Sequence, residues 1–172
     1  MRKILIDTGV TQRVNCRGAV PETVELIGDA LAQELDSRGC ETATSCRIPD
    51  LGESSGRPSR CAEMARRWGA DCLLRLYVRA AADPCAGSAD AMVYRTRSRS
   101  GEIANNLLAA LERDTGIRNG GVRSAGGVIL LRKTPCPCVI LILRLSYQEK
   151  EFPTEESVHR YASALADGLL ES

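Results

Sequence analysis

Short apolar runs alternate with segments of helical periodicity along this chain of 172 residues. The runs at 3–6, 72–78 and 139–145 have the length and composition of strands. Between the first two runs, apolar side chains recur every three or four residues on one helical face, at Val20, Val24, Ile27, Leu31 and Leu35. Alternating strands and helices are typical of parallel sheets. The pattern therefore predicts one α/β domain over residues 1–172, with a mostly parallel central sheet of about six strands and helices on both faces.

The same patterns place the remaining elements. Further strands are expected at 41–45, 91–94 and 128–131, and further helices at 59–68, 101–113 and from Thr154 onward. The stretch 49–58, rich in Gly, Ser and Pro, is expected to be a loop. The pairs Gly120-Gly121 and Gly126-Gly127 lack the spacing of a phosphate-binding loop, so we expect ordinary turns there.

The composition excludes several classes of function. Lys and Arg number 23 against 22 Asp and Glu, and the resulting net charge of +1 argues against an obligatory polyanion binder. Aromatic residues make up only 3%, so the chain offers no stacking platform for bases and we expect no nucleic-acid partner. No apolar run approaches the length of about eighteen residues that a membrane span needs, so no membrane is expected. The sequence carries no signal of oligomeric state.

The amino-terminal segment and the cysteines bear on location. The segment reaches the acidic Asp7 too early for a secretory signal, which predicts a cytoplasmic protein or one exported without a signal peptide. We therefore expect the eight cysteines to be reduced and mostly packed as small apolar residues. No Cys-x-x-Cys pair occurs; Cys136 and Cys138, two residues apart, could share a metal or oxidise, but packing is the favoured interpretation.

Several segments, in order, resemble one enzyme family. Residues 4–9, Ile-Leu-Ile-Asp-Thr-Gly, resemble the opening strand of the zinc-dependent N-acetylmuramoyl-L-alanine amidases, whose loop reads Asp-Pro-Gly-His-Gly. Residues 60–71, ending in Trp-Gly-Ala-Asp, resemble the helix that precedes the family's Ser-Ile-His-Ala-Asn strand. Residues 115–122 are similar to the stretch around Arg-Gly-Val, and 128–132 with Pro137 and the next strand to Val-Leu-Arg…Pro-Ala-Val-Leu-Val-Glu. With the final helix, the match spans nearly the whole chain and implies the amidase fold.

The resemblance also implies a set of matched positions. The family holds a zinc ion with two His and one Glu, and a second Glu acts as general acid and base. The zinc activates a water for attack on the amide between the sugar lactyl group and L-alanine. By the resemblance, the two His fall on Val10 and Tyr77, and the catalytic Glu falls on Ile142. The ligand Glu falls near Val20, or on Glu22 if the loop is shifted by two residues.

The matched positions lack the donors that zinc requires. Valine and isoleucine have no donor atom, and tyrosine phenols, which ionise only near pH 10, are poor zinc ligands. The chain also has a single histidine, His159 on the last predicted helix, where a surface role is expected. Two histidine ligands cannot be built from one residue, so we expect that zinc has been lost and that no metal is bound.

Three arginines are candidates for ligand binding at the matched site. Arg75 and Arg79 share strand parity with Tyr77, and Arg144 shares it with Ile142. All three are therefore expected to surround the position where the family holds its zinc. Alternatively they reach solvent at the strand ends, or form salt bridges with the acidic residues Asp7, Asp83 and Glu22.

These observations lead to a functional prediction with two alternatives. We expect an amidase-fold protein related to bacterial peptidoglycan (cell-wall) hydrolases, catalytically inactive, with a binding or scaffolding role toward a peptidoglycan fragment or a partner protein. The first alternative is an active amidase with a rebuilt metal site that draws on Cys16, Glu22 or Asp7. The second is an anion-binding α/β domain that uses the arginine cluster, with Asp7 and Glu22 as further ligand-binding candidates.

Overall fold

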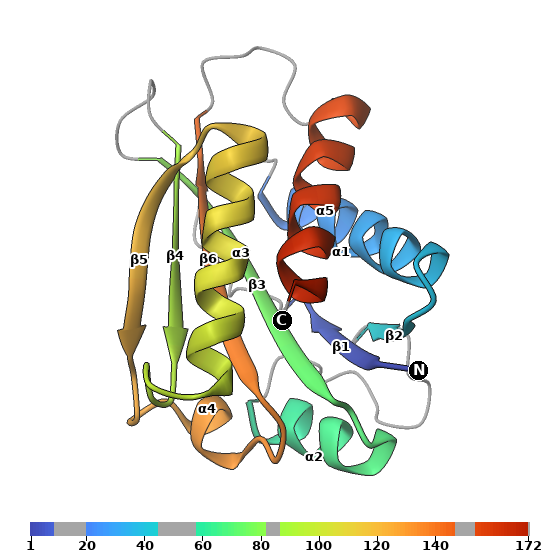
Figure 1. Ribbon diagram of the computed structural model, residues 1–172, viewed down its shortest axis with the longest axis vertical. Helices are drawn as coiled ribbons and strands as arrows, with labels where there is room; N and C mark the ends of the chain where they lie inside the picture. The colour runs from blue at the N-terminus through green and yellow to red at the C-terminus, as the bar shows by residue number, and fades with distance from the viewer. Residues whose placement is uncertain (9–19, 45–57, 82–86, 147–153, 172) are drawn as a thin grey trace.

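Strands and helices alternate along the computed structural model, which describes residues 1–8, 20–44, 58–81, 87–146 and 154–171 (Figure 1). The strands are β1 (Lys3–Asp7), β2 (Glu41–Thr44), β3 (Cys72–Ala80), β4 (Ser88–Val93), β5 (Arg118–Ser124) and β6 (Cys138–Leu145). The helices are α1 (Val20–Ser37), α2 (Pro58–Trp68), α3 (Arg99–Thr115), α4 (Ile129–Lys133) and α5 (Glu155–Leu170). The predicted loop 49–58 lies outside the described residues except for its last residue, which begins α2.

The six strands form one sheet in the order β2-β1-β3-β6-β4-β5. Strands β2, β1, β3 and β6 run parallel, β4 is antiparallel to β6, and β5 is parallel to β4. The carboxyl ends of β1, β3 and β6 therefore lie at the same edge of the sheet as the amino ends of β4 and β5. The predicted α/β class and mostly parallel sheet are confirmed.

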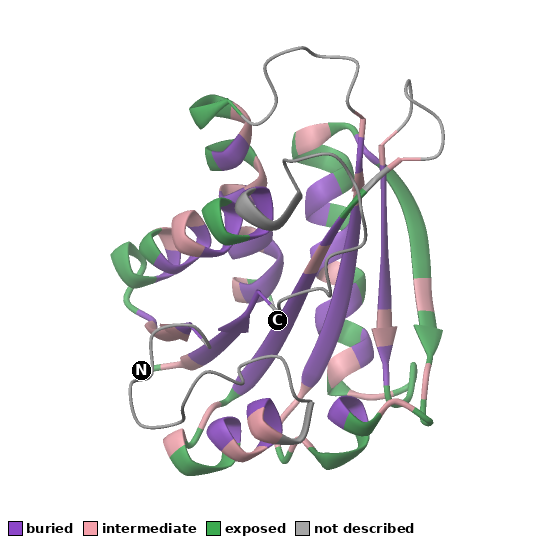
Figure 2. Cartoon of the chain, turned by 180° about the vertical axis from the view of Figure 1, so that it is seen from behind, coloured by how far each residue is buried: buried purple, intermediate pink, exposed green. Residues whose placement is uncertain are grey.

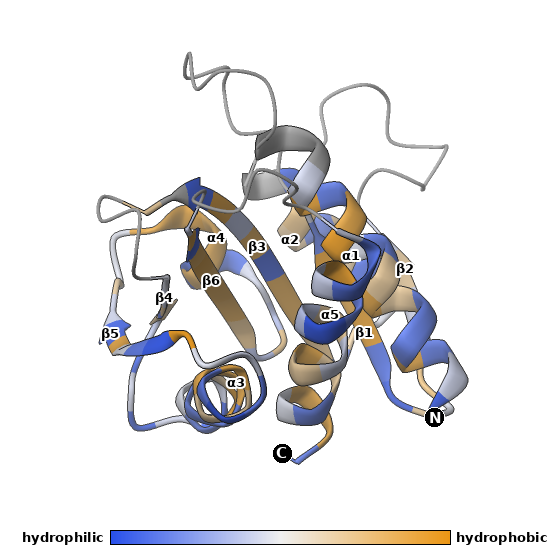
Figure 3. Ribbon diagram, turned by 90° about the horizontal axis from the view of Figure 1, so that it is seen from above, coloured by the Kyte–Doolittle hydropathy of each residue, from blue (hydrophilic) through white to orange (hydrophobic). Residues whose placement is uncertain are grey.

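Helices cover both faces of the sheet, as predicted (Figure 3). On one face, α1, α3 and α5 pack on alternate strand residues such as Ile4, Leu74 and Leu141. On the other face, α2 and α4 pack on the intervening residues, among them Leu5 and Leu73. The central strands are buried on both faces, which accounts for their nearly continuous apolar sequences. In the part of the chain that the structure describes, no helix has the length and hydropathy needed to span a membrane.

The prediction of a strand at 128–131 is wrong, because these residues enter a short helix, α4. Periodicity cannot distinguish a helix from a strand in so short an apolar run. The consecutive residues Leu130 and Leu131 are both buried, and both pack in the same cluster as α2. A strand would have pointed these two side chains to opposite faces.

The expectation of an ordinary turn at Gly120-Gly121 is also wrong, because both residues lie within β5. This strand is polar and largely exposed at the edge of the sheet, so it carries no apolar alternation that would reveal it. Its pairing with β4 shifts register between Ala89 and Ala91, which makes a β-bulge. Gly121 has a φ of +86°, a conformation that glycine adopts without strain. The second expected turn is confirmed at Gly126-Gly127.

The packing of α5 on α3 supplies a test of the fold. A Cβ atom on Gly168 would lie 2.6 Å from the Cα atom of Leu107, a backbone atom of α3 that cannot move alone. We expect Gly168→Ala to lower the free energy of unfolding by about 1–3 kcal/mol through overpacking, although alanine favours helices. Denaturant unfolding measures the change. The control is Gly127→Ala, where a Cβ meets nothing within 4 Å; equal stability of the two variants would contradict the close helix contact.

Candidate functional site

Polar side chains gather on the α2/α4 face of the sheet, toward the carboxyl ends of β3 and β6. The strand register pairs Tyr77 of β3 with Ile142 of β6, and Ile142 with Asp90 of β4. The next row pairs Arg79 with Arg144. Helices α2 and α4 cover this face near the amino ends of the two central strands, as the view from behind shows (Figure 2). The rows that contain Tyr77 and Arg79 therefore lie toward the carboxyl ends of β3 and β6, away from these two helices.

The three predicted arginines lie on this one face, but their environments differ. Arg75 is 4% exposed, whereas Arg79 is exposed to solvent. Arg144 is intermediate, with 31% of its side chain exposed. The register brings Arg79 and Arg144 directly opposite each other, and Arg75 lies two rows away, opposite Ile140. The arginines therefore do not form one cluster around a common point.

Arg75 forms a buried ion pair with Asp7. The Arg75 Nε atom lies 3.1 Å from the Asp7 Oδ2 atom, and the side chains are 5% and 0% exposed. The two residues are register partners on neighbouring parallel strands, so the sheet itself holds them together. The Nε–H makes no hydrogen bond among the described residues, so charge rather than hydrogen-bond geometry holds this contact. One of the salt bridges considered from the sequence is thus present.

Two further side chains complete this buried cluster. The Cys61 thiol, carried by α2, donates a hydrogen bond of 3.2 Å to Asp7 Oδ2. Burial, and then the negative charge of Asp7, raise the pKa of the Cys61 thiol to about 12, so it stays protonated as a donor at neutral pH. On the other side, the Arg75 Cζ atom lies 5.4 Å from the centre of the Tyr77 ring, a cation–π contact.

Asp90 pairs with Arg144 and was not identified from the sequence. One Asp90 oxygen contacts Arg144 Nη1, and the other accepts a 2.8 Å hydrogen bond from Arg123 Nη2. Asp90 is only 8% exposed, so it needs these charges. A short signal was present, because the polar residues Ser88 and Asp90 alternate with the apolar residues Ala89 and Ala91, as expected of a strand with one polar face.

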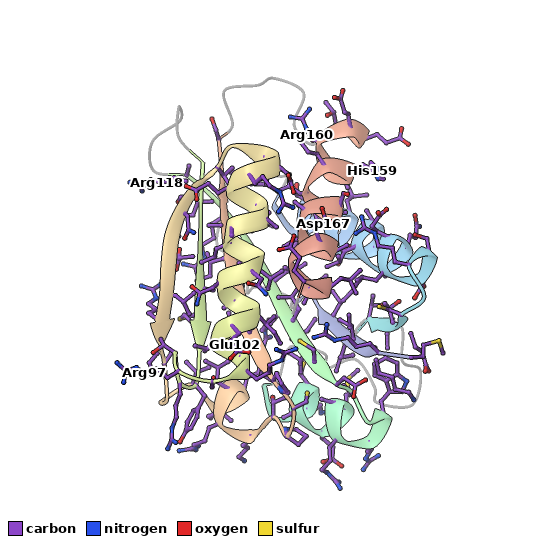
Figure 4. All side chains as sticks on the ribbon, viewed as in Figure 1. Arg97, Glu102, Arg118, His159, Arg160 and Asp167 are labelled. Carbon is purple, nitrogen blue, oxygen red and sulfur yellow. The ribbon has the colours of Figure 1, made fainter. Side chains whose placement is uncertain are left out.

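The remaining predicted positions are placed as follows. Ile142 is buried in the apolar cluster with α2 and α4, and Tyr77 packs against that cluster with part of its surface exposed. His159 is exposed on α5, on the opposite side of the sheet (Figure 4). Val10, Cys16 and Asp83 lie outside the described residues. Val20 and Glu22 lie in α1, but their side chains are likewise outside the described part.

The described residues of this site do not fit a zinc ion. Ile142 offers no donor, and the Arg75 guanidinium places a fixed positive charge beside Tyr77. Within the described ranges, no group of three or more His, Cys, Asp and Glu residues could hold a metal. The five cysteines in these ranges are free thiols, and four of them are buried. Burial raises the pKa of Cys136 to about 11 and of Cys72 to about 12, which disfavours the thiolate that a metal binds.

Comparison with known proteins identifies the architecture. No model of a protein family matches the sequence, and no curated protein matches it significantly. Solved structures do match. The catalytic domain of CwlV, an N-acetylmuramoyl-L-alanine amidase from Bacillus (Paenibacillus) polymyxa var. colistinus, superimposes with a TM-score of 0.78 at 19% identity, over 99% of this chain and 97% of that one. This chain has the amidase fold.

Two further structures agree with this assignment. The amidase AmiC2 of Nostoc punctiforme matches with a TM-score of 0.78 at 19% identity, over 99% of this chain and 96% of its own. The CwlD amidase from Clostridioides difficile, solved in complex with the GerS lipoprotein, matches with a TM-score of 0.80 at 14% identity, over 99% and 98%. The expected amidase fold is confirmed along the whole length of the domain.

The buried Asp7–Arg75 pair predicts an unequal response to mutation. Arg75→Met keeps much of the side-chain volume but leaves the Asp7 carboxylate buried without its cation. We expect the free energy of unfolding to fall by about 3–5 kcal/mol, measured by urea denaturation. The matched control is Arg99→Met, which removes an exposed ion pair with Glu102 and should cost less than about 1 kcal/mol. Equal losses in the two variants would show that the pair is not buried in solution.

Proposed function

We propose that this chain is an amidase-fold protein without zinc and without amide hydrolysis, whose role is to bind a peptidoglycan fragment or a partner protein. The observation that supports it best is the buried Asp7–Arg75 pair beside Tyr77. It puts a permanent cation on the face where, by the sequence resemblance, the family's second histidine falls.

The charge of Arg75 argues against a metal at this place. An arginine guanidinium is a permanent positive charge, and it repels a divalent cation in a poorly solvated site. It also provides the counter-charge that the buried Asp7 needs, so the carboxylate is already neutralised without a metal. Arg75 thus balances the charge of this cluster, but it cannot activate a water as zinc does.

The positions matched to catalytic residues support the same proposal. Ile142, on which the family's catalytic Glu falls by the sequence resemblance, is 5% exposed and packs among apolar side chains. No proton can be exchanged there, so general acid and base catalysis has no residue at this position. The whole chain contains one histidine, and that residue is on α5, away from this face. A two-histidine zinc site is therefore not available to one chain.

The alternative of an active enzyme with a rebuilt metal site is less well supported. Of the residues considered for it, Asp7 is fully buried and already paired with Arg75 and Cys61. The other two, Cys16 and the Glu22 side chain, lie outside the described residues. A binding role, by contrast, requires only the retained fold. CwlD, which has this fold, was solved in complex with a lipoprotein, so binding of a protein partner has a precedent among these structures.

Metal analysis and wall digestion test the loss of activity. We expect plasma mass spectrometry to find far less than one zinc per chain after mild purification, and we expect no dye release from labelled peptidoglycan with or without added zinc. A stoichiometric zinc ion together with zinc-dependent dye release would reject the proposal. Sedimentation with purified peptidoglycan, followed by competition with soluble muropeptides, measures the proposed wall binding separately; absence from the pellet would leave the partner-protein role.

Restoring the family's donors tests the role of Arg75. The variant Val10→His, Val20→Glu, Tyr77→His, Ile142→Glu carries the matched ligands, but we expect weak zinc binding because the guanidinium remains. Adding Arg75→Ser should tighten zinc binding by about tenfold or more, measured by competition with a chelating dye. The control is Arg79→Ser in the same background, which removes an exposed charge. Equal gains from both substitutions would show that the effect is not specific to the buried cation.

A further inference from the structure

A cavity of about 280 Å³ opens along β4, β5 and the end of β6. Its lining includes Ser88, Asp90, Arg118, Arg123 and Arg144, together with the glycines of the β5 bulge. Apart from Arg144, none of these residues was among the candidates from the sequence. The cavity is small for a ligand site and suits one chemical group rather than a whole drug-sized molecule.

The bulge in β5 creates the space. It sets Gly120 and Gly121 opposite the single residue Asp90, so no side chain from β5 projects at that point. The Asn119 side chain stabilises the bulge by accepting a 2.9 Å hydrogen bond from the Gly121 N–H. A Cβ on Gly120 would lie only 3.0 Å from the carbonyl oxygen of Ala89, tighter than most Cβ contacts, so the close approach of the strands favours glycine there. Bulges often occur next to functional sites, where they redirect side chains.

The cavity carries excess positive charge. Among the described residues, three arginines line it against one carboxylate, Asp90, which contacts Arg123 and Arg144. Within this described set, one carboxylate neutralises one guanidinium, so two positive charges remain. The third arginine, Arg118, is exposed and forms no ion pair with any described residue.

The hydrogen-bond donors converge because of the strand register. Ser88 of β4 lies directly opposite Arg118 of β5 on one side and Arg144 of β6 on the other. All three side chains therefore share one row and one face of the sheet. Ser88 is 8% exposed, and within the described ranges its hydroxyl has no hydrogen-bond partner. An arginine, a serine hydroxyl and a second arginine in a row form a donor set that fits the oxygens of an anion.

We propose that this cavity binds a small oxyanion, either a carboxylate or a phosphate group, at the end of a larger molecule. Arg118 and Ser88 supply the free donors, and Asp90 holds Arg123 and Arg144 in place at the wall of the cavity. Arginine forks bind both carboxylate and phosphate in a planar arrangement, so the shared chemistry is the oxyanion. The proposal does not depend on the loss of zinc, since none of these residues belongs to the matched metal positions.

Calorimetry on the whole chain tests the proposal. Inorganic phosphate and succinate are titrated separately at constant ionic strength, which distinguishes the two anion types and suppresses weak screening effects. We expect saturable binding of at least one of them at a single site. Arg118→Ala and Arg123→Ala should each weaken that binding by about fivefold or more. The matched control is Arg97→Ala, an exposed arginine near the opposite end of the sheet, which should bind like the unmodified chain (Figure 4).

Several results would overturn the proposal. Absence of saturable binding of both anions would reject it, as would an equal loss in Arg118→Ala and Arg97→Ala, since that pattern is general charge attraction. Thermal unfolding is measured for each variant. Because Arg118 forms no ion pair with any described residue, its variant should melt like the unmodified chain. If Arg123→Ala alone lowers the melting temperature, the anion affinity of Arg118→Ala decides whether the proposal holds. Zinc content and dye release are measured separately from anion binding. The proposed function can therefore be rejected while anion binding is confirmed, and anion binding can be rejected while the proposed function is confirmed.

Discussion

A carboxylate with no exposed surface must be paired, and Asp7 is such a group at the end of β1. The parallel register of β1 and β3 places Arg75 next to it, and the thiol of Cys61 reaches it from α2. The pairing of Asp7 therefore joins β1, β3 and α2 at one point near the carboxyl end of β1. It also determines the chemistry of the face, because a guanidinium held there by Asp7 is a fixed charge beside Tyr77.

The central part of the fold was predictable from the sequence, because strands buried on both faces leave a strong signal. The runs that form β3 and β6 are apolar almost throughout, and α1 has a clear apolar stripe. The edge was not predictable in the same way. Strand β5 forms by backbone pairing with β4, while its side chains stay in solvent and show no pattern. Helix α4 is a single short apolar stretch, for which packing on α2 rather than local periodicity decides the structure.

The candidate site was likewise predictable only in part. Strand parity correctly placed Arg75, Arg79 and Arg144 on one face, because alternation is a local property of any strand. Parity could not show that the first would be buried against Asp7 while the second stays in solvent, since this depends on which helices cover which rows. Asp90 is a similar case. Its importance comes from two arginines on different strands, and one of them, Arg123, lies on the edge strand that the sequence concealed.

The arginines on this face differ in exposure, and the exposure of each determines what its guanidinium can do. Arg75 is buried and fully used by Asp7, so it cannot take part in reversible binding without unfolding cost. Arg144 is intermediate in exposure, and Asp90 holds its guanidinium at the wall of the cavity. Arg118 is exposed on the edge strand, where its guanidinium can exchange water for a ligand at little cost. Positive charge near the centre of the sheet thus stabilises the fold and opposes a metal, whereas positive charge at the β4–β5 edge is available to an anion. In our proposal the same residue type therefore serves structure near the centre of the sheet and recognition at its β4–β5 edge, and burial sets the difference.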